Sequence, residues 1–357
     1  MTKLVIHAGT HKTGTTSLQK AFATSYDLLS KNGVYYPLNW RFFYKSPPES
    51  QSKNAHFGFA RALANPTGNA KKSLEKFHND LCEKAKTHHT ILLSAESIYR
   101  HVDAMNAPIG TNWSEEERRR LYLQRLKQYF SEFSTSILLF FRRPDMLAES
   151  LYGEVIANTN RFPTFPAHLV NSQHFYDYST KIIQFKEYFS VNLINYEHAC
   201  ATDLLKTAYK YISDEVEPPK LANNFRTSLS KSAVLWLRRT KFEKSGKMSE
   251  IERRRRWLFA LQRSSAHYFD TPTGASYFGN AFSRQLFYEN SVENLRDIDF
   301  LAPDSSGFCQ AQWNDIQHNE SEKAFVDWQE KHIKLLVERE AAKIEPFILT
   351  GFEEQNS

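Results

Sequence analysis

The chain has 357 residues, and its 46 Lys and Arg against 40 Asp and Glu leave a formal net charge of +6 with neutral histidines. Hydrophobic residues make up 41% and aromatic residues 14%, which excludes a wholly disordered chain and allows a sizeable core. Only 12 Gly and 13 Pro are present, which disfavours an all-β fold of many short strands and favours long helices.

The number of cysteines and the lengths of the apolar runs indicate the cellular compartment of the protein. Cys82, Cys200 and Cys309 are too few and too far apart for a disulfide framework or a Cys-x-x-Cys metal site. The longest apolar runs, such as 137–141, have the length of a strand, so we expect no transmembrane helix. The first residues lack the apolar stretch of a signal peptide. We therefore expect a cytoplasmic protein.

Short apolar runs alternate with helical patterns over the first 213 residues. Buried strands are predicted at 4–7, 90–97, 136–145 and 191–196. Helices are predicted after the loop that ends at residue 16, at 56–64, 70–87, 114–132, from Pro144 onward, and at 172–189 and 201–213. The helix at 114 begins with the capping-box pattern Ser114-x-x-Glu117, and Pro144 suits a first helical turn. This alternation predicts an α/β fold with helices around a central parallel sheet.

Beyond residue 220 only helical patterns continue, at 229–243, 248–266, 281–294 and 320–343. No flexible linker separates them from the preceding part. We therefore predict a single domain over 1–345, with an α/β nucleotide-binding core at 1–220, a helical cover at 221–345 and a tail at 346–357.

The loop Gly9–Thr16 follows the first predicted strand and precedes a helix. Its small residues let backbone N–H groups point into the turn, and a helix N-terminus adds positive potential, so the loop predicts an anion site. Lys12 adds a full charge, and Thr15 and Thr16 add hydroxyl donors. A Walker A loop would carry lysine directly after Gly14, whereas here the lysine comes two residues before it. An ordinary βα connection is the alternative.

The run Lys-Thr-Gly-Thr-Thr-Ser at 12–17 resembles the 5′-phosphosulfate loop of sulfotransferases, which use 3′-phosphoadenosine 5′-phosphosulfate (PAPS). The stretch HAGTHKTGTTSLQ is most similar to bacterial sulfotransferase-like proteins. The resemblance implies a three-layer α/β/α, P-loop-like sulfotransferase fold. It also implies cofactor contacts from His11, Lys12, Thr13, Gly14, Thr15, Thr16 and Ser17.

A second anion site is predicted where the third long strand ends. Arg142 closes that strand, and Ser150 follows eight residues later on a helix, so both side chains can converge on one phosphate. The pattern resembles the family's 3′-phosphate motif, in which this Arg and Ser distinguish PAPS from ATP. Tyr196 resembles the family's aromatic residue near the adenine. A surface ion pair for Arg142 and a core position for Tyr196 are the alternatives.

Sulfuryl transfer requires a base for the acceptor hydroxyl and a charge on the leaving phosphate. Lys12 is the candidate for the leaving group. The resemblance places Ser94-x-Glu96 where cytosolic sulfotransferases carry Lys-x-His, so Glu96 is the first candidate base and His56 the second. A structural role is the alternative for both. The resemblance implies no metal, and the product would be adenosine 3′,5′-bisphosphate.

The acceptor is predicted to be a saccharide or another hydroxyl compound, partly because a long loop supplies the aromatic residues Trp40, Phe42, Phe43 and Tyr44. The basic run at 253–256 is either a solvated helix face or a contact with an anionic surface, including peripheral contact with a membrane. No nucleic-acid partner is expected. Two alternatives remain: a P-loop nucleotide kinase or NTPase, and a non-catalytic protein of the same fold that binds anionic glycans.

Overall fold

The computed structural model describes residues 1–40, 42, 54–100, 113–159, 161–213, 216–219, 229–231, 233–234, 237–238, 276–278, 281–292 and 295. The chain forms two compact units, and both are discontinuous in sequence. The first unit comprises 1–143, 177–225 and 294–310, and the second comprises 144–176, 226–293 and 311–357. The predicted helices at 248–266 and 320–343 and the predicted tail lie outside the described residues. The single domain over 1–345 stays a prediction.

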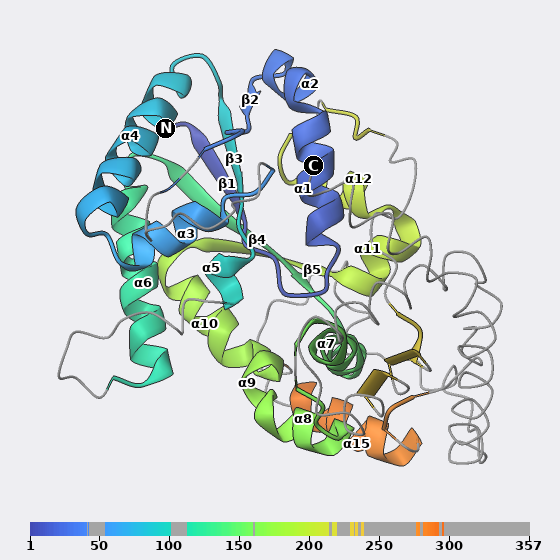
Figure 1. The fold of residues 1–357 in the computed structure, drawn as a ribbon. Coiled ribbons are helices and arrows are strands. Elements are labelled where there is room, and N and C mark those ends of the chain that lie inside the picture. Colours follow the sequence, from blue (N-terminus) through green and yellow to red (C-terminus); the bar gives the residue numbers. More distant parts are fainter. Residues whose placement is uncertain are drawn as a thin grey trace, which may run out of the picture. The chain divides into compact units, whose positions relative to one another are not determined.

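The first unit contains a five-stranded sheet in the order β2-β3-β1-β4-β5, with every pairing parallel (Figure 1). The strands are β1 (Lys3–His7), β2 (Val34–Tyr35), β3 (Thr90–Ser94), β4 (Ser134–Phe141) and β5 (Ser190–Asn195). Both faces of the sheet are covered, which explains why the central strands are continuous apolar runs rather than alternating ones. The predicted α/β fold with a parallel sheet is confirmed.

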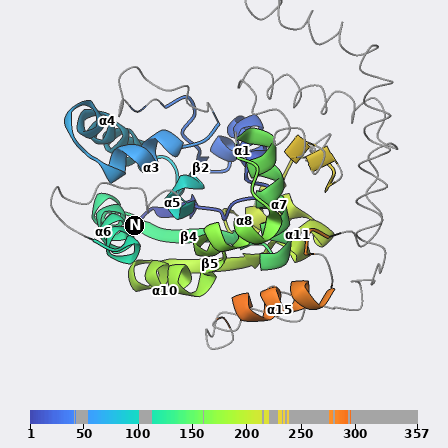
Figure 2. The same ribbon diagram turned by 60° about the horizontal axis from the view of Figure 1, so that its bottom comes forward.

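Helices lie on both sides of this sheet, with α1 on one side and α10 on the other (Figures 1 and 2). The helices of the first unit are α1 (Thr15–Thr24), α2 (Tyr26–Lys31), α3 (Phe57–Ala64), α4 (Gly68–Lys84), α5 (Ser97–Arg100), α6 (Glu115–Tyr129), α10 (Tyr178–Tyr188), α11 (Tyr196–Thr202) and α12 (Leu204–Lys210). Phe22 of α1 and Tyr209 of α12 pack with Val5 and Phe140 of the sheet, all of them buried. This core holds α1, and with it the loop before α1, against the sheet.

The second unit contains α7 (Pro144–Asn158), α8 (Phe165–Asn171), α9 (Gln173–Tyr176) and α15 (Ala281–Val292). Two buried carboxylates on α7 hold segments that lie far apart in sequence. Asp145 accepts a 2.6 Å hydrogen bond from Arg284 of α15. Glu149 accepts hydrogen bonds from Lys231 and from the hydroxyl of Ser276. Charged pairs inside the unit therefore join its discontinuous parts.

Side-chain caps decide where several helices begin. The capping box at Ser114 and Glu117 is confirmed, and Pro144 is the first residue of α7, as predicted. Two predicted helices, at 172–189 and 201–213, are each interrupted by an aspartate that caps a new helix. Asp177 accepts from the Thr180 N–H at the start of α10, and Asp203 caps α12 in the same way.

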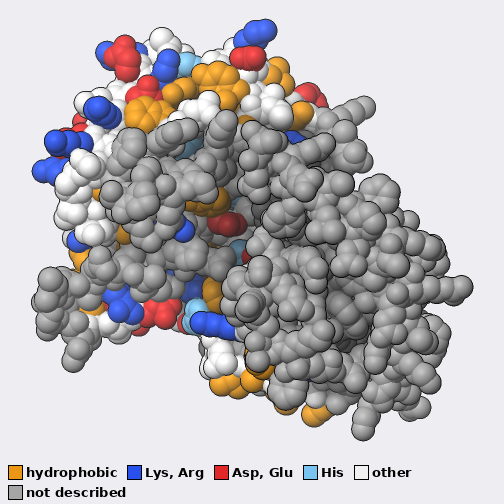
Figure 3. Space-filling view, viewed as in Figure 1, with side chains coloured by type: hydrophobic (Ala, Val, Ile, Leu, Met, Phe, Trp, Pro, Cys, Tyr) orange, Lys and Arg blue, Asp and Glu red, His pale blue; other side chains and the backbone are white. Residues whose placement is uncertain are grey.

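None of the described helices is long and apolar enough to cross a bilayer. Where α2 and α4 lie, the surface in Figure 3 carries basic and acidic side chains of the described residues side by side. That part of the surface therefore has no patch of a single sign.

Candidate active site

The loop after β1 lies at the carboxyl edge of the sheet, between the ends of β3 and β4. Strands β3 and β2 lie on one flank of β1, and β4 and β5 lie on the other, so the strand order reverses direction at β1. Ligands of open α/β sheets bind at such a switch point. The Ala8 N–H donates to Leu138 of β4 at 3.1 Å, and the Thr10 hydroxyl donates to the Phe140 carbonyl at 2.5 Å. The base of the loop is thus anchored to the neighbouring strand.

The loop adopts a backbone shape that few residues tolerate. Lys12 and Gly14 have φ angles of 62° and 70°, in the left-handed region. A Cβ on Gly14 would lie 2.7 Å from Leu204 and 3.4 Å from the Tyr196 ring, so only glycine fits there. Gly14 is also the N-cap of α1 and has no side chain to cap its first turn. The N–H groups of that turn are therefore suited to an anion.

The loop hydroxyls have different partners. Thr13 is buried and donates to the carbonyl of Thr10 at 2.6 Å, so it supports the loop from inside. Thr15 is buried and donates to Oε2 of Glu96 at 2.7 Å. Thr16 is exposed and Ser17 is half-buried, both in the first turn of α1. The structure thus joins the predicted base to the predicted anion loop, a contact that the sequence did not predict.

Arg142 brings the predicted motifs together. Its Nη1 donates to the backbone carbonyl of Lys12 at 3.1 Å. Its guanidinium carbon lies 5.6 Å from the centre of the Tyr196 ring, within the range of a cation–π contact. Three sequence segments that the resemblance assigned to one nucleotide therefore meet in one place.

Glu197 belongs to the same site, and sequence reasoning missed its role there. Its Oε1 lies 3.7 Å from Nε of Arg142, and its Oε2 accepts from the Arg143 N–H at 3.2 Å. Burial raises the pKa of Glu197, although Arg142 counteracts part of this rise. Burial likewise raises the pKa of Tyr196, so the phenol stays neutral. The sequence signal that could have indicated this role is the acidic residue directly after Tyr196.

Two atoms of this ion pair lack a hydrogen bond. Nε of Arg142 and Oε1 of Glu197 are both buried and without a hydrogen-bond partner. Buried polar groups are normally satisfied, and a guanidinium has five N–H donors in a fork that matches a phosphate. The two atoms face each other at 3.7 Å, so the ion pair is not closed by a hydrogen bond.

His56, the second candidate base, is fully committed to structure. Its Nδ1 accepts from the Ser94 N–H at 2.9 Å, and its Nε2 donates to the Pro37 carbonyl at 2.7 Å. Burial lowers its pKa to about 4, so the ring is neutral at neutral pH. With both ring nitrogens engaged, His56 is placed to hold the end of β3 rather than to accept a proton from a substrate.

His7 lies buried beneath the loop. Its Nδ1 is 2.8 Å from the Ser94 hydroxyl, and its Nε2 is buried without a partner. Burial lowers the pKa of His7 to about 4. His7 and Ser94 are also register partners in β1 and β3, so this contact joins the two strands directly below the site.

The other predicted residues are described to different extents. His11 is half-buried in the loop. Ser150 lies on α7 in the second unit, so its predicted pairing with Arg142 stays a prediction. Phe42, one of the loop aromatics that could stack on a sugar ring, is 1% exposed and packs on Phe77. Phe43, Tyr44 and the basic run at 253–256 lie outside the described residues.

No protein-family model matches this chain, and no curated protein matches it either. The assignment of the site therefore rests on the residues and contacts given above.

Proposed function

We propose that this chain is a PAPS-dependent sulfotransferase that transfers a sulfuryl group to a hydroxyl of an acceptor, with a saccharide as the favoured class. The observation that carries the proposal is the meeting of Lys12, Arg142 and Tyr196 at one edge of the sheet. The residues that resemble the two phosphate motifs of that family lie 130 positions apart in sequence, yet they share a hydrogen bond.

The site residues fit the donor substrate. PAPS supplies an activated sulfuryl group and two separate anionic ends. Lys12, the exposed Thr16 hydroxyl and the uncapped first turn of α1 would hold the phosphosulfate end. Arg142 would hold the 3′-phosphate, and Tyr196 would contact the adenine. The part predicted for Ser150, which belongs to the second unit, stays a prediction. The P-loop-like sulfotransferase fold, the helical C-terminal part and a cytoplasmic location belong to the same proposal.

The chain's own groups can supply the chemistry. Glu96 accepts the proton of the acceptor hydroxyl, and the Thr15 hydrogen bond fixes the carboxylate for that task. Lys12 offers positive charge to the phosphate oxygen that gains negative charge as the sulfur–oxygen bond breaks. Because the loop is anchored to β4, these groups are held in place before the substrates bind.

The test is a calorimetric titration of the whole chain with adenosine 3′,5′-bisphosphate. We expect micromolar binding that weakens at least tenfold, about 1.4 kcal/mol, in Arg142→Ala and in Lys12→Ala. Arg120→Ala, which removes an exposed arginine on α6, is the matched control and should bind like the wild type. Equal binding by wild type and Arg142→Ala would contradict the proposed donor site.

One observation favours the second candidate, a P-loop nucleotide kinase or NTPase. The sequence suggested no metal ligand beside the loop, yet Glu96 accepts a hydrogen bond from Thr15 there. A carboxylate and a hydroxyl together are the ligands that Mg²⁺ takes beside nucleotide phosphates. A parallel titration with ATP and Mg²⁺ separates the two candidates. Tight binding of ATP–Mg²⁺ without binding of the bisphosphate would replace the first proposal by the second.

A further inference from the structure

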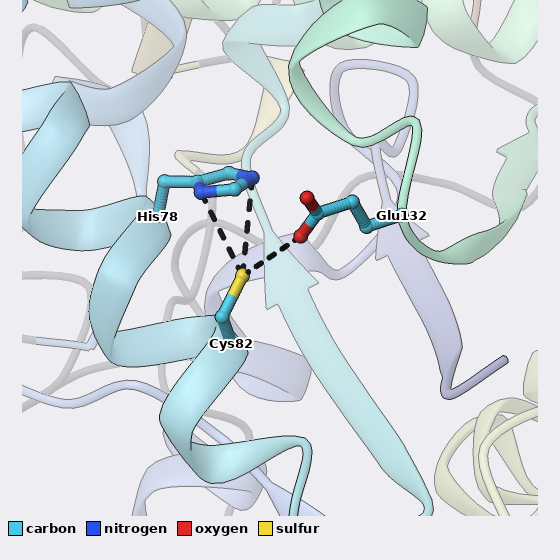
Figure 4. A group of neighbouring side chains, drawn as sticks. All are labelled: His78, Cys82 and Glu132. Atoms are coloured by element: carbon cyan, nitrogen blue, oxygen red, sulfur yellow. Dashed lines mark hydrogen bonds between the residues drawn. The ribbon is translucent and has the colours of Figure 1, made fainter.

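Three side chains that can ligate a metal meet beside the end of α4 (Figure 4). His78 and Cys82 lie one turn apart on α4, and Glu132 comes from the segment between α6 and β4. Sγ of Cys82 lies 3.2 Å from a carboxylate oxygen of Glu132 and 3.6 Å from Nδ1 of His78. One nitrogen, one sulfur and one oxygen from two separate segments therefore surround the same small space.

The spacing of these atoms matches a first coordination shell. With Zn–S near 2.3 Å and Zn–N or Zn–O near 2.0–2.1 Å, tetrahedral ligand atoms lie about 3.3–3.7 Å apart. The two distances from Cys82 are 3.2 and 3.6 Å, and all three ligand atoms lie within 4.8 Å of one another, so small shifts would bring them to this geometry.

The surroundings favour a fixed geometry. The His78 ring packs edge-on against Tyr129 at 5.2 Å and lies 6.3 Å from Phe133. The Tyr129 hydroxyl donates to the Leu74 carbonyl, which holds this aromatic wall to α4. His78 and Cys82 are half-buried, whereas Glu132 is exposed, so an ion can enter from the solvent side.

We propose that His78, Cys82 and Glu132 form a binding site for a divalent transition-metal ion of the zinc class. The donor set decides the class, because thiolate and imidazole favour zinc, whereas Mg²⁺ and Ca²⁺ take oxygen ligands only. Binding replaces the thiol proton, which leaves to solvent as the Cys82 sulfur bonds to the metal. Water completes the tetrahedron.

The ion would act on structure rather than on group transfer. Glu132 lies two residues before β4, whose first residue pairs with Lys3 at the start of β1. The anion loop lies at the carboxyl ends of these parallel strands, whereas Glu132 lies at their amino ends. A metal here therefore joins the end of α4 to the entry of β4, on the other edge of the sheet from Glu96. The proposal is independent of the sulfotransferase proposal.

The test is a titration of the reduced, chelator-treated whole chain with Zn²⁺, followed by calorimetry, with Co²⁺ as a spectroscopic probe. We expect one ion per chain and a thiolate-to-cobalt absorption band in the near ultraviolet. Cys82→Ser should abolish the band and weaken Zn²⁺ binding at least tenfold, and Glu132→Gln should weaken it too. Cys200→Ser removes an exposed cysteine elsewhere and is the matched control, with band and affinity retained.

A measurement on the unaltered chain avoids any folding defect of the variants. Zn²⁺ should slow the alkylation of Cys82 by iodoacetamide, as mapped by peptide mass spectrometry, and leave Cys200 unaffected. Equal alkylation of Cys82 with and without Zn²⁺ would overturn the proposal. A cobalt band that persists in Cys82→Ser would overturn it as well.

Discussion

At the residue scale, the Thr15 hydroxyl orients Glu96 among the described residues. Thr15 donates to one of its carboxylate oxygens at 2.7 Å. If Glu96 accepts the acceptor's proton, Glu96→Gln should lower the rate of sulfuryl transfer about 10²–10⁴-fold, because an amide accepts no proton at this pH. Binding of adenosine 3′,5′-bisphosphate should change little. Steady-state kinetics alongside calorimetry measure both quantities.

Glu75→Gln is the control for this experiment, because Glu75 is an exposed carboxylate on α4. It should leave the transfer rate unchanged. Thr15→Val keeps the carboxylate but removes the hydrogen bond that orients it, so the rate should fall by less than in Glu96→Gln. A fully active Glu96→Gln protein would refute the proposed base.

The buried histidines predict how stability depends on pH. His7 and His56 have pKa values of about 4 in the folded chain because burial disfavours their charged forms. An unfolded histidine titrates near 6.5, so between these values the unfolded chain binds more protons. Stability is therefore complete above about pH 6.5 and falls as the pH is lowered toward 4. At pH 5 each histidine would remove about 2 kcal/mol.

Urea unfolding at pH 7 and pH 5 tests this dependence. His7→Asn should lose less stability between the two pH values than the wild type does, even if it is less stable at both. His198→Gln replaces an exposed histidine and should keep the full dependence. An unchanged pH dependence in His7→Asn would show that His7 titrates normally.

The site could be predicted only in part, for reasons that differ between residues. Lys12, Arg142 and Tyr196 follow strands, so their meeting at one edge follows from the parallel sheet alone. The pairing of Glu197 with Arg142 depends on the φ and χ angles of a turn, which no sequence pattern specifies. Phe42 was a candidate for stacking on a sugar ring because it lies in a predicted loop, but its ring packs on Phe59 and Phe77 instead.

At the scale of elements, the turn into α1 depends on Gly14. An alanine there would need a φ of 70° and would place its Cβ 2.7 Å from Leu204. We expect Gly14→Ala to cost more than the ~1 kcal/mol of the left-handed conformation alone, because the contact adds to the strain. It should also weaken binding of the bisphosphate. Thermal unfolding and calorimetry measure the two effects.

Gly68 offers a closely matched control. It also has a positive φ, of 51°, but a Cβ there would meet nothing within 4 Å. Gly68→Ala should therefore show the conformational cost without the steric one and should leave nucleotide binding intact. Equal effects of the two substitutions on binding would mean that the shape of the loop does not matter.

The elements themselves were largely predictable. The four longer strands lie within a few residues of their predicted positions, because a buried parallel strand is a continuous apolar run. Strand β2 was missed because two residues, Val34 and Tyr35, make no pattern. The breaks at Asp177 and Asp203 were missed because helical periodicity continues through a capping residue.

At the scale of the molecule, the second unit is held together by charges as well as by apolar packing. The ion pair of Asp145 with Arg284 is almost completely buried, with side-chain exposures of 0% and 9%. Asp145→Asn would leave a buried cation without its partner, which costs roughly 3–5 kcal/mol. The double variant Asp145→Asn with Arg284→Met should be more stable than the single variant.

Thermal unfolding of the four proteins of this cycle measures the coupling. Glu116→Gln breaks an exposed ion pair with Arg120 on α6 and should change the melting temperature little. A single variant as stable as the double one would mean that solvent reaches Arg284.

The order of the strands and the division into units were beyond sequence reasoning. Strand order depends on which strands pair after collapse, and every buried strand here is apolar enough to pair with any other. The boundary between Arg143 and Pro144 also follows no break in composition, since strand and helix directly adjoin.

This interleaving has a consequence during protein synthesis. Strand β4 needs β5 on its outer side, but the segment 144–176 of the other unit is translated between them. At ~5–20 residues per second, the roughly 50 residues from the end of β4 to the end of β5 take about 3–10 s. The nascent chain therefore leaves the ribosome with an apolar strand edge that lacks its neighbour. Such an edge is what chaperones recognise and what stray strands pair with.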